Sequence, residues 1–464
     1  MHISRVNITN VRMGFAINSS STHSIILNPI ITPFAPEEDW QYGWEDFLIV
    51  SPQDKMKYMA TTLCSNLSYV VPDEWVVPIV SSLLKMDIPD ERYVDHQSLI
   101  CLPTEFRHWP CAVPNMEFFN DLTKYIVNNG VAIAGGNDNQ EDDEKVDYGG
   151  TQDPKLINLP IDNRFGDLVA CKDGEYWILF NRRSGTKIRL SFTTDKPYEY
   201  ASKPELVDLK ITSYCPQNCK FCYTDSKITG THAPWRDAIN ALSTLEVFEV
   251  VLGGGDPTTH SNFADILEEI YHCSMIPSFA TRNTHWLEIP SITEAVKKYC
   301  PGFAVSIESS NIDMLNTFSA WKTLHKYLGQ ISVQHVLGVD DTNTVCYFLE
   351  KVKALGFQRI TFLGFKAKGR GKTFKPQNID IKQILDKCKE LHLNVGMDTS
   401  AVNQHYDVLK TLDVPDVLMQ RGEGVFSMFI DLVEGYIAPS SFSDHTIQYK
   451  NLLKDIQTYF PWKE

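Results

Sequence analysis

The second half of the sequence predicts an α/β fold, and two observations carry this prediction. Between positions 201 and 400, six short apolar runs alternate with segments of helical character, which is typical of parallel strands joined by crossover helices. Segments rich in cysteine and glycine directly follow the first two runs, where such folds gather their chemistry. The sequence therefore predicts a parallel α/β sheet or a partial barrel. The six expected strands are 205–212, 247–254, 276–281, 302–309, 330–339 and 357–365.

The chain before this region follows other patterns. Residues 1–160 predict an irregular α+β accessory region of unknown role, with helices near 51–69 and 115–129. An acidic, glycine-flanked segment at 135–154 has no apolar period and predicts an exposed loop or linker. Residues 161–200 alternate polar and apolar positions around Asp-Gly and Ser-Gly turns, so they predict a small antiparallel β segment.

The last part of the chain, residues 401–464, predicts a small C-terminal module. Two alternating runs flank Glu434 and Gly435, which indicates a β-hairpin. We therefore expect three parts with different architectures: an irregular first region, an α/β core at 201–400 and a hairpin/helix module at the end.

Composition narrows the class of protein. The chain has 464 residues and a net charge of −15, which argues against nucleic-acid binding because phosphate neutralisation needs a basic surface. No apolar stretch reaches the roughly 18 residues of a membrane helix, and the N-terminus lacks a signal-peptide core, so we expect no membrane partner. Eleven cysteines, an odd number, favour reduced thiols over a disulfide framework and a cytoplasmic location.

Three cysteines on one short segment, Cys215, Cys219 and Cys222, are the strongest chemical signal. Thiolates at this spacing can converge on one metal centre. Structural zinc needs four closed ligands, for which His232 would have to complete the set. An iron–sulfur cube normally takes four cysteines, so three leave one iron open to a substrate or cofactor. Zinc, a cluster with an open iron, and simple buried cysteines remain the alternatives at this point.

The spacing of these cysteines, with the aromatic Phe221 before the last, resembles the signature of the radical S-adenosylmethionine (SAM) superfamily. The resemblance, which covers about residues 200–440, implies a partial (βα)6 barrel and a [4Fe-4S] cluster on Cys215, Cys219 and Cys222. It also implies that SAM binds the open iron and is cleaved reductively to a 5′-deoxyadenosyl radical, which abstracts hydrogen from the substrate. A flavodoxin- or ferredoxin-type reductant is the implied electron donor.

Further positions resemble the SAM-binding residues of that superfamily. Gly253 to Pro257 match the glycine-rich motif, except that Asp256 stands where Glu is usual. Asp is one methylene shorter, so the expected contact with the methionine ammonium comes either from this carboxylate or from backbone carbonyls. Polar residues at the third and fourth strand ends, and the end of the sixth strand, resemble positions near the SAM ribose, carboxylate and adenine. The implied SAM-binding residues are Phe221, Gly253, Gly254, Gly255, Asp256, Asn283, Ser306, Glu308 and Leu363.

Residues 424–442 resemble the hairpin of a SPASM or twitch extension, which is found in enzymes that modify peptides and proteins. Ser440 stands where those relatives have a cluster cysteine, and no cysteine follows Cys388, so no auxiliary cluster is expected. The resemblance favours a peptide or protein substrate. A nucleotide or small anionic metabolite is the alternative, supported by the basic segment 363–375, and a non-enzymatic zinc or iron–sulfur protein is the alternative of another class. No catalytic side chain is assigned.

Overall fold

The structure, a computed structural model, divides into two compact units, Met1–Tyr198 (unit 1) and Glu199–Glu464 (unit 2). It describes residues 7–12, 24–27, 39–43, 47–68, 72–94, 116–127, 131–135, 168–182, 185–194, 196–412, 414 and 418–462. The acidic segment expected to form an exposed loop lies outside these residues, except for Gly135. No helix among the described residues has the length and apolar character needed to cross a bilayer.

Unit 1 combines small sheets with three helices. The helices expected near 51–69 and 115–129 are confirmed as α1 and α3, whereas α2 was not expected. β7, β8 and β9 pair antiparallel, as expected, and β1 adds to β9 to give the order β1-β9-β8-β7. The elements are β1 (Asn7–Arg12), β2 (Ser24–Leu27), β3 (Gln41–Tyr42), β4 (Phe47–Ile49), α1 (Pro52–Leu67), α2 (Asp73–Leu84), β5 (Tyr93–Val94), α3 (Met116–Ile126), β6 (Val131–Gly135), β7 (Leu168–Asp173), β8 (Tyr176–Asn181) and β9 (Lys187–Ser191).

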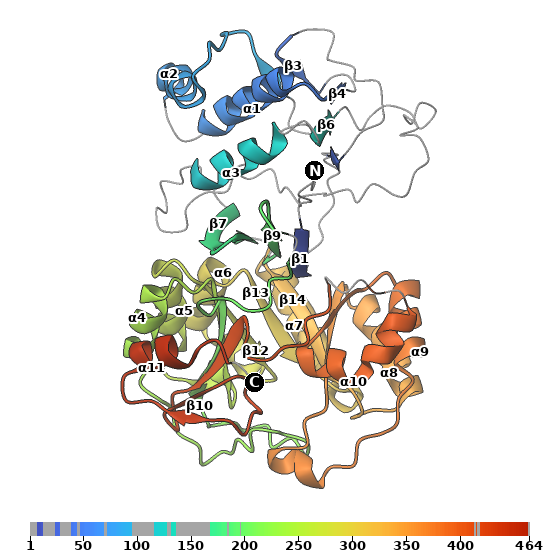
Figure 1. The fold of residues 1–464 in the computed structure, drawn as a ribbon. Helices are drawn as coiled ribbons and strands as arrows, with labels where there is room; N and C mark the ends of the chain where they lie inside the picture. The colour runs from blue at the N-terminus through green and yellow to red at the C-terminus, as the bar shows by residue number, and fades with distance from the viewer. Residues whose placement is uncertain are drawn as a thin grey trace. The chain divides into compact units, whose positions relative to one another are not determined.

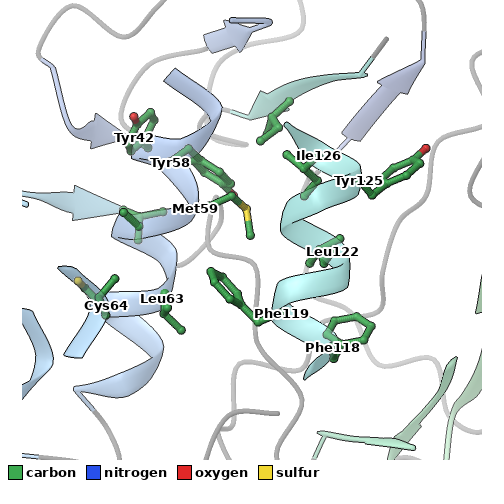
Figure 2. Close-up of a cluster of buried hydrophobic side chains, with 14 of the residues drawn as sticks. Tyr42, Tyr58, Met59, Leu63, Cys64, Phe118, Phe119, Leu122, Tyr125 and Ile126 are labelled. Carbon is green, nitrogen blue, oxygen red and sulfur yellow. The ribbon is translucent and has the colours of Figure 1, made fainter. Parts of the chain in front are cut away.

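The core of unit 1 forms where α1 and α3 face each other. Ser51 caps α1 by accepting a hydrogen bond from the Asp54 amide, which satisfies one of the free donors of the first turn. Figure 2 shows Met59 of α1 and Phe119 of α3 projecting into the space between the two helices, and both side chains are completely buried. Apolar burial is the main stabilising term in a core of this kind.

Unit 2 is built on one large sheet, flanked by helices (Figure 1). The six expected strands are confirmed as β10 to β15, and they are parallel neighbours in chain order. β16 extends the sheet beyond β15, so the α/β class predicted from the sequence is confirmed. The strands are β10 (Leu206–Thr212), β11 (Glu249–Gly254), β12 (Ile276–Thr281), β13 (Gly302–Ser306), β14 (Gln330–Val336), β15 (Arg359–Leu363), β16 (Asn394–Met397), β17 (Ser427–Asp431), β18 (Tyr436–Ala438) and β19 (Ile447–Gln448).

The crossover segments of unit 2 are helical because their apolar residues recur on one face, which packs on the sheet. In β10, Val207, Leu209 and Ile211 are completely buried, and the side chains between them alternate to the opposite face. The longer helices are α4 (Arg236–Thr244), α5 (Phe263–His272), α6 (Pro290–Tyr299), α7 (Met314–Leu324), α8 (Thr342–Ala354), α9 (Ile381–Glu390), α10 (Thr399–Thr411) and α11 (Leu452–Tyr459).

The expected C-terminal hairpin forms, as β17 and β18, with Gly435 in the left-handed region at φ 75°. Instead of making a separate sheet, β17 pairs parallel to β10 and continues the large sheet. The full order is β16-β15-β14-β13-β12-β11-β10-β17-β18-β19. The resemblance of this hairpin to a SPASM or twitch extension remains a prediction.

Candidate functional site

The three cysteines lie on the loop that follows β10. The loop is anchored at its base, where the Cys215 amide donates to the Lys227 carbonyl at 2.9 Å. At its far end the Cys222 amide donates to the Cys219 carbonyl at 3.3 Å. The backbone of Asn218 adopts a left-handed conformation at φ 48°, which folds the loop tightly between the first two cysteines. All three thiols are free of disulfides and half-buried.

The surroundings of the thiols affect their protonation. Burial raises the pKa of the Cys215 thiol to about 11, and the neighbouring Asp256 carboxylate adds to the shift. Burial also raises the pKa of Cys219, although the guanidinium of Arg282 opposes this. These electrostatic contacts place the cysteine loop beside residues that follow β11 and β12.

In the turn after β11, glycines occupy the positions at which the backbone comes closest to the cysteine loop. A Cβ atom on Gly255 would lie 1.9 Å from the Tyr214 carbonyl oxygen, and one on Gly254 would lie 2.2 Å from the Thr212 carbonyl oxygen. Gly254 also has φ +119°, which side chains rarely adopt. A Cβ on Gly253 would meet nothing within 4 Å, so this glycine borders open space. Gly254 and Gly255 therefore allow the two loops to touch.

Asp256 is buried, and its carboxylate is occupied by protein donors. It accepts hydrogen bonds from the hydroxyls of Thr258 and Thr281 at 2.6 and 2.8 Å. The backbone amides of Arg282 and Asn283 donate to it at 3.0 and 3.2 Å. The carboxylate thus ties the end of β12 to the glycine turn. Of the two contacts expected here, this arrangement favours the one through backbone carbonyls, and direct ligand binding by Asp256 remains a prediction.

Arg282 and Glu308 form an ion pair at the ends of β12 and β13. The Glu308 side chain is only 4% exposed, and burial raises its pKa, whereas Arg282 opposes that shift. The guanidinium also lies 5.5 Å from the ring centroid of Phe221, within cation–π range. Arg282 therefore connects the aromatic residue of the cysteine signature to the end of β13.

The other expected SAM-binding positions lie at strand ends of the same sheet. Ser306, at the end of β13, donates its hydroxyl to Gln334 at 3.1 Å. The Asn283 amide donates to the Thr258 hydroxyl at 3.0 Å, so this side chain is already engaged. Leu363 ends β15, where its carbonyl accepts from the Leu337 amide at 2.8 Å. All these positions lie at the carboxyl ends of parallel strands, but the SAM contacts themselves remain predictions.

Three of the five cations in the basic segment after β15 form ion pairs within the protein. The Lys366 ammonium contacts Asp398 at 2.8 Å and lies 5.2 and 4.9 Å from the ring centroids of Tyr223 and Phe442. Two further cations of the segment are paired in the same way. The three pairs are Lys366–Asp398, Lys368–Asp444 and Arg370–Asp225. These pairings weaken the hypothesis, based on the charge of this segment, that the substrate is anionic.

Two carboxylates near Lys366 were not anticipated from the sequence. Burial raises the pKa of Asp208, in β10, to about 6, and that of Glu423 to about 7. Lys366 lowers both pKa values, whereas Asp398 raises them. Neither Asp208 nor Glu423 accepts a hydrogen bond from the residues that the structure describes. A signal existed in the sequence, because Asp208 and Lys210 are charged residues within the apolar run of β10.

Across the described ranges, no group of three or more His, Cys, Asp or Glu side chains is arranged to hold a metal ion.

Comparison with known proteins identifies part of the chain. Residues 209–365 match the family model described as the Radical SAM superfamily. The sequence matches no curated protein. A solved structure of Streptococcus suis SuiB bound to SAM is similar at 13% identity and a TM-score of 0.48, over 64% of this chain and 87% of that one. Native anSMEcpe with bound SAM is similar at 12% identity and a TM-score of 0.38, over 55% and 81% of the two chains.

Proposed function

We propose that the chain is a radical SAM enzyme, because residues 209–365 match the model of that superfamily, and that it modifies a peptide or protein substrate. The observation that carries the choice of substrate is the charge balance at the strand ends. Three of the five cations of the basic segment are paired internally, whereas Asp208 and Glu423 leave carboxylates without hydrogen-bond donors among the described residues. Anionic metabolites would be repelled there, so a polypeptide fits better than a nucleotide.

We propose that Cys215, Cys219 and Cys222 hold a [4Fe-4S] cluster. Three free, half-buried thiols on one loop are a suitable donor set, because cluster irons take thiolate ligands and each sulfur ligates a separate iron. When bound, the cluster supplies the electron that cleaves SAM and the open iron that holds it. Residues of this chain bind and orient these groups rather than carry out the redox chemistry.

The proposed SAM-binding site consists of the glycine turn after β11 and the Arg282–Glu308 ion pair. The open space beside Gly253 admits a ligand close to the backbone, and the backbone carbonyls of this turn can accept hydrogen bonds from an ammonium. Arg282 contributes a positive charge beside Phe221 and Cys219, which suits a ligand carboxylate. Ser306 and Glu308, at the end of β13, would orient the ribose. We also retain a cytoplasmic location and a flavodoxin- or ferredoxin-type reductant as proposals.

The reaction class is tested by anaerobic reconstitution with iron and sulfide, followed by dithionite and SAM. The expected product is 5′-deoxyadenosine in the wild type and none in Cys222→Ala. Zinc without iron or sulfide in anaerobically purified protein would instead support the non-enzymatic alternative.

The substrate class is tested with extract from cells grown in heavy water, separated into a peptide fraction and a small-metabolite fraction. Hydrogen abstraction transfers deuterium from the substrate to 5′-deoxyadenosine, which mass spectrometry detects. Deuterium acquired from the peptide fraction supports the proposal. Deuterium acquired only from the small-metabolite fraction would contradict it.

A further inference from the structure

Arg370, in the basic segment after β15, makes four hydrogen bonds to the cysteine loop. Its backbone amide donates to the Cys222 carbonyl at 2.9 Å, and its Nε donates to the Cys219 carbonyl at 2.8 Å. Its Nη1 donates to the Asp225 carboxylate at 2.9 Å and to the Ser226 carbonyl at 3.0 Å. The side chain therefore fixes the backbone at Cys219 and at the end of the loop, whereas the backbone amide of Arg370 makes the contact at Cys222.

Glycines on both sides of Arg370 allow this close contact. A Cβ on Gly369 would lie 2.5 Å from the Tyr223 carbonyl oxygen, and this glycine has φ +52°. A Cβ on Gly371 would lie 2.6 Å from the Lys366 carbonyl oxygen. The backbone of the basic segment thus packs directly on the backbone of the cysteine loop, without intervening side chains.

The contact joins two loops that the sheet keeps apart. Four strands, β11 to β14, separate β10 from β15 in the sheet order. Both loops leave the carboxyl ends of parallel strands, so they meet across the mouth of the curved sheet. Arg370 and the cysteines that it contacts are about 150 residues apart in the chain, as the separation of 151 between Arg370 and Cys219 shows.

We propose that Arg370 is a positioning residue: its side chain holds Cys219, beside the backbone contact at Cys222, in the arrangement needed for cluster binding. This inference rests on the proposed function. The planar guanidinium donates in fixed directions to three acceptors at once, which a lysine ammonium cannot reproduce even though it carries the same charge. The role of Arg370 is therefore geometric as well as electrostatic, and the two contributions can be separated by substitution.

The test uses the full chain in three variants. Arg370→Lys keeps the positive charge but removes the planar guanidinium, and Arg370→Met removes both. Lys372→Met removes a neighbouring exposed cation and is the matched control. The first readout is hydrogen exchange of the amides of residues 219–226 in the cluster-free protein. Both Arg370 variants are expected to accelerate exchange by at least about tenfold, the factor that the loss of one charge-assisted hydrogen bond produces, and Arg370→Met, which loses all three side-chain bonds, by more than Arg370→Lys. Lys372→Met is expected to exchange like the wild type.

The second readout is made after reconstitution. We expect both Arg370 variants to retain fewer irons per chain and to show an altered electron paramagnetic resonance spectrum of the reduced cluster, while circular dichroism shows an unchanged fold. Wild-type exchange, iron retention and spectrum in Arg370→Lys would overturn the positioning role. Because the exchange readout needs no cluster, a wild type that binds no iron would refute the proposed function without deciding the role of Arg370, which the exchange data decide on their own.

Discussion

The two units of the molecule use their interiors differently. In unit 1, aromatic rings meet edge to face, as Tyr42 and Tyr58 do at 5.2 Å and 88°. Unit 2 has a similar apolar layer, where Phe279 stacks on Phe303 at 5.0 Å. Both units bury charged side chains, Lys55 and Lys187 among those of unit 1, but in unit 2 buried and partly buried ion pairs gather at the strand ends. Burying charges costs stability unless they are paired, so their concentration at one edge of a sheet marks a functional region rather than a packing solution. The interior of unit 1 serves the stability of its fold, whereas unit 2 also holds the charged side chains of the candidate site.

The largest expected difference between the units is the loss of bound iron when a cysteine is replaced. Cys222→Ala in unit 2 removes one of the three proposed cluster ligands, so we expect loss of nearly all bound iron and of SAM cleavage. Cys64→Ala in unit 1 replaces a buried thiol that acts as a small apolar side chain, and iron content should not change. Iron and sulfide analysis after anaerobic reconstitution measures both. Equal iron loss in the two variants would mean that the thiols of unit 1 also bind metal.

Large-to-small substitutions test whether the cores are equivalent. Phe119 in unit 1 and Phe279 in unit 2 are 0% and 1% exposed, so truncation of either to Ala should cost about 3–5 kcal/mol of unfolding free energy. Because Phe279 lies in β12, close to Arg282, only its truncation should lower iron retention. Urea denaturation and iron analysis give the two quantities. Iron loss in Phe119→Ala would show that the site depends on the core of unit 1.

Sequence patterns within a short window predict individual strands and helices, but they do not predict contacts between residues far apart in the chain. The six strands β10 to β15 could be predicted because each is a short apolar run bounded by turns, and the cysteine loop because its ligands are close in sequence. Helix α2 could not, because Pro78 lies inside it and normally argues against a helix. The parallel pairing of β17 with β10 and the clamp by Arg370 both join residues far apart in the chain, for which periodicity holds no signal. The sequence shows the basic segment, but its charge does not reveal which residues its cations pair with.

Replacing a shifted carboxylate by its amide should change the free energy of unfolding in opposite directions in the two units. Asp208 has its pKa raised from 3.8 to about 6 by burial, so its ionisation destabilises the folded state as pH rises through this window. A shift of about two units corresponds to at most about 3 kcal/mol. Asp208→Asn should therefore be more stable than the wild type at pH 7.5 by up to that amount, and the difference should vanish below about pH 4. Urea unfolding across this pH range measures it.

Asp121 in unit 1 provides the matched control with the opposite sign. Burial raises its pKa, but hydrogen bonds from Lys172 and Trp177 outweigh burial and leave the pKa below its usual value. Its ionised form therefore stabilises the fold above the ordinary pKa, and Asp121→Asn should be less stable than the wild type at neutral pH. Two destabilising substitutions, or a pH-independent difference for Asp208→Asn, would contradict the view that charge is tolerated in unit 2 at the expense of stability.

Helix caps should show the smallest effects and no difference between units. Ser51 accepts a hydrogen bond from the Asp54 amide at the start of α1, and Asn451 accepts one from the Lys454 amide at the start of α11, each at 3.0 Å. Substitution of either cap by Ala leaves one donor of the first helical turn without its partner and should cost about 1 kcal/mol. Both caps are neutral, so the loss should not depend on pH between 5 and 8, unlike that of Asp208→Asn. Thermal unfolding at several pH values measures the two variants, and a pH-dependent loss in either would mean that the cap also acts through a titrating neighbour.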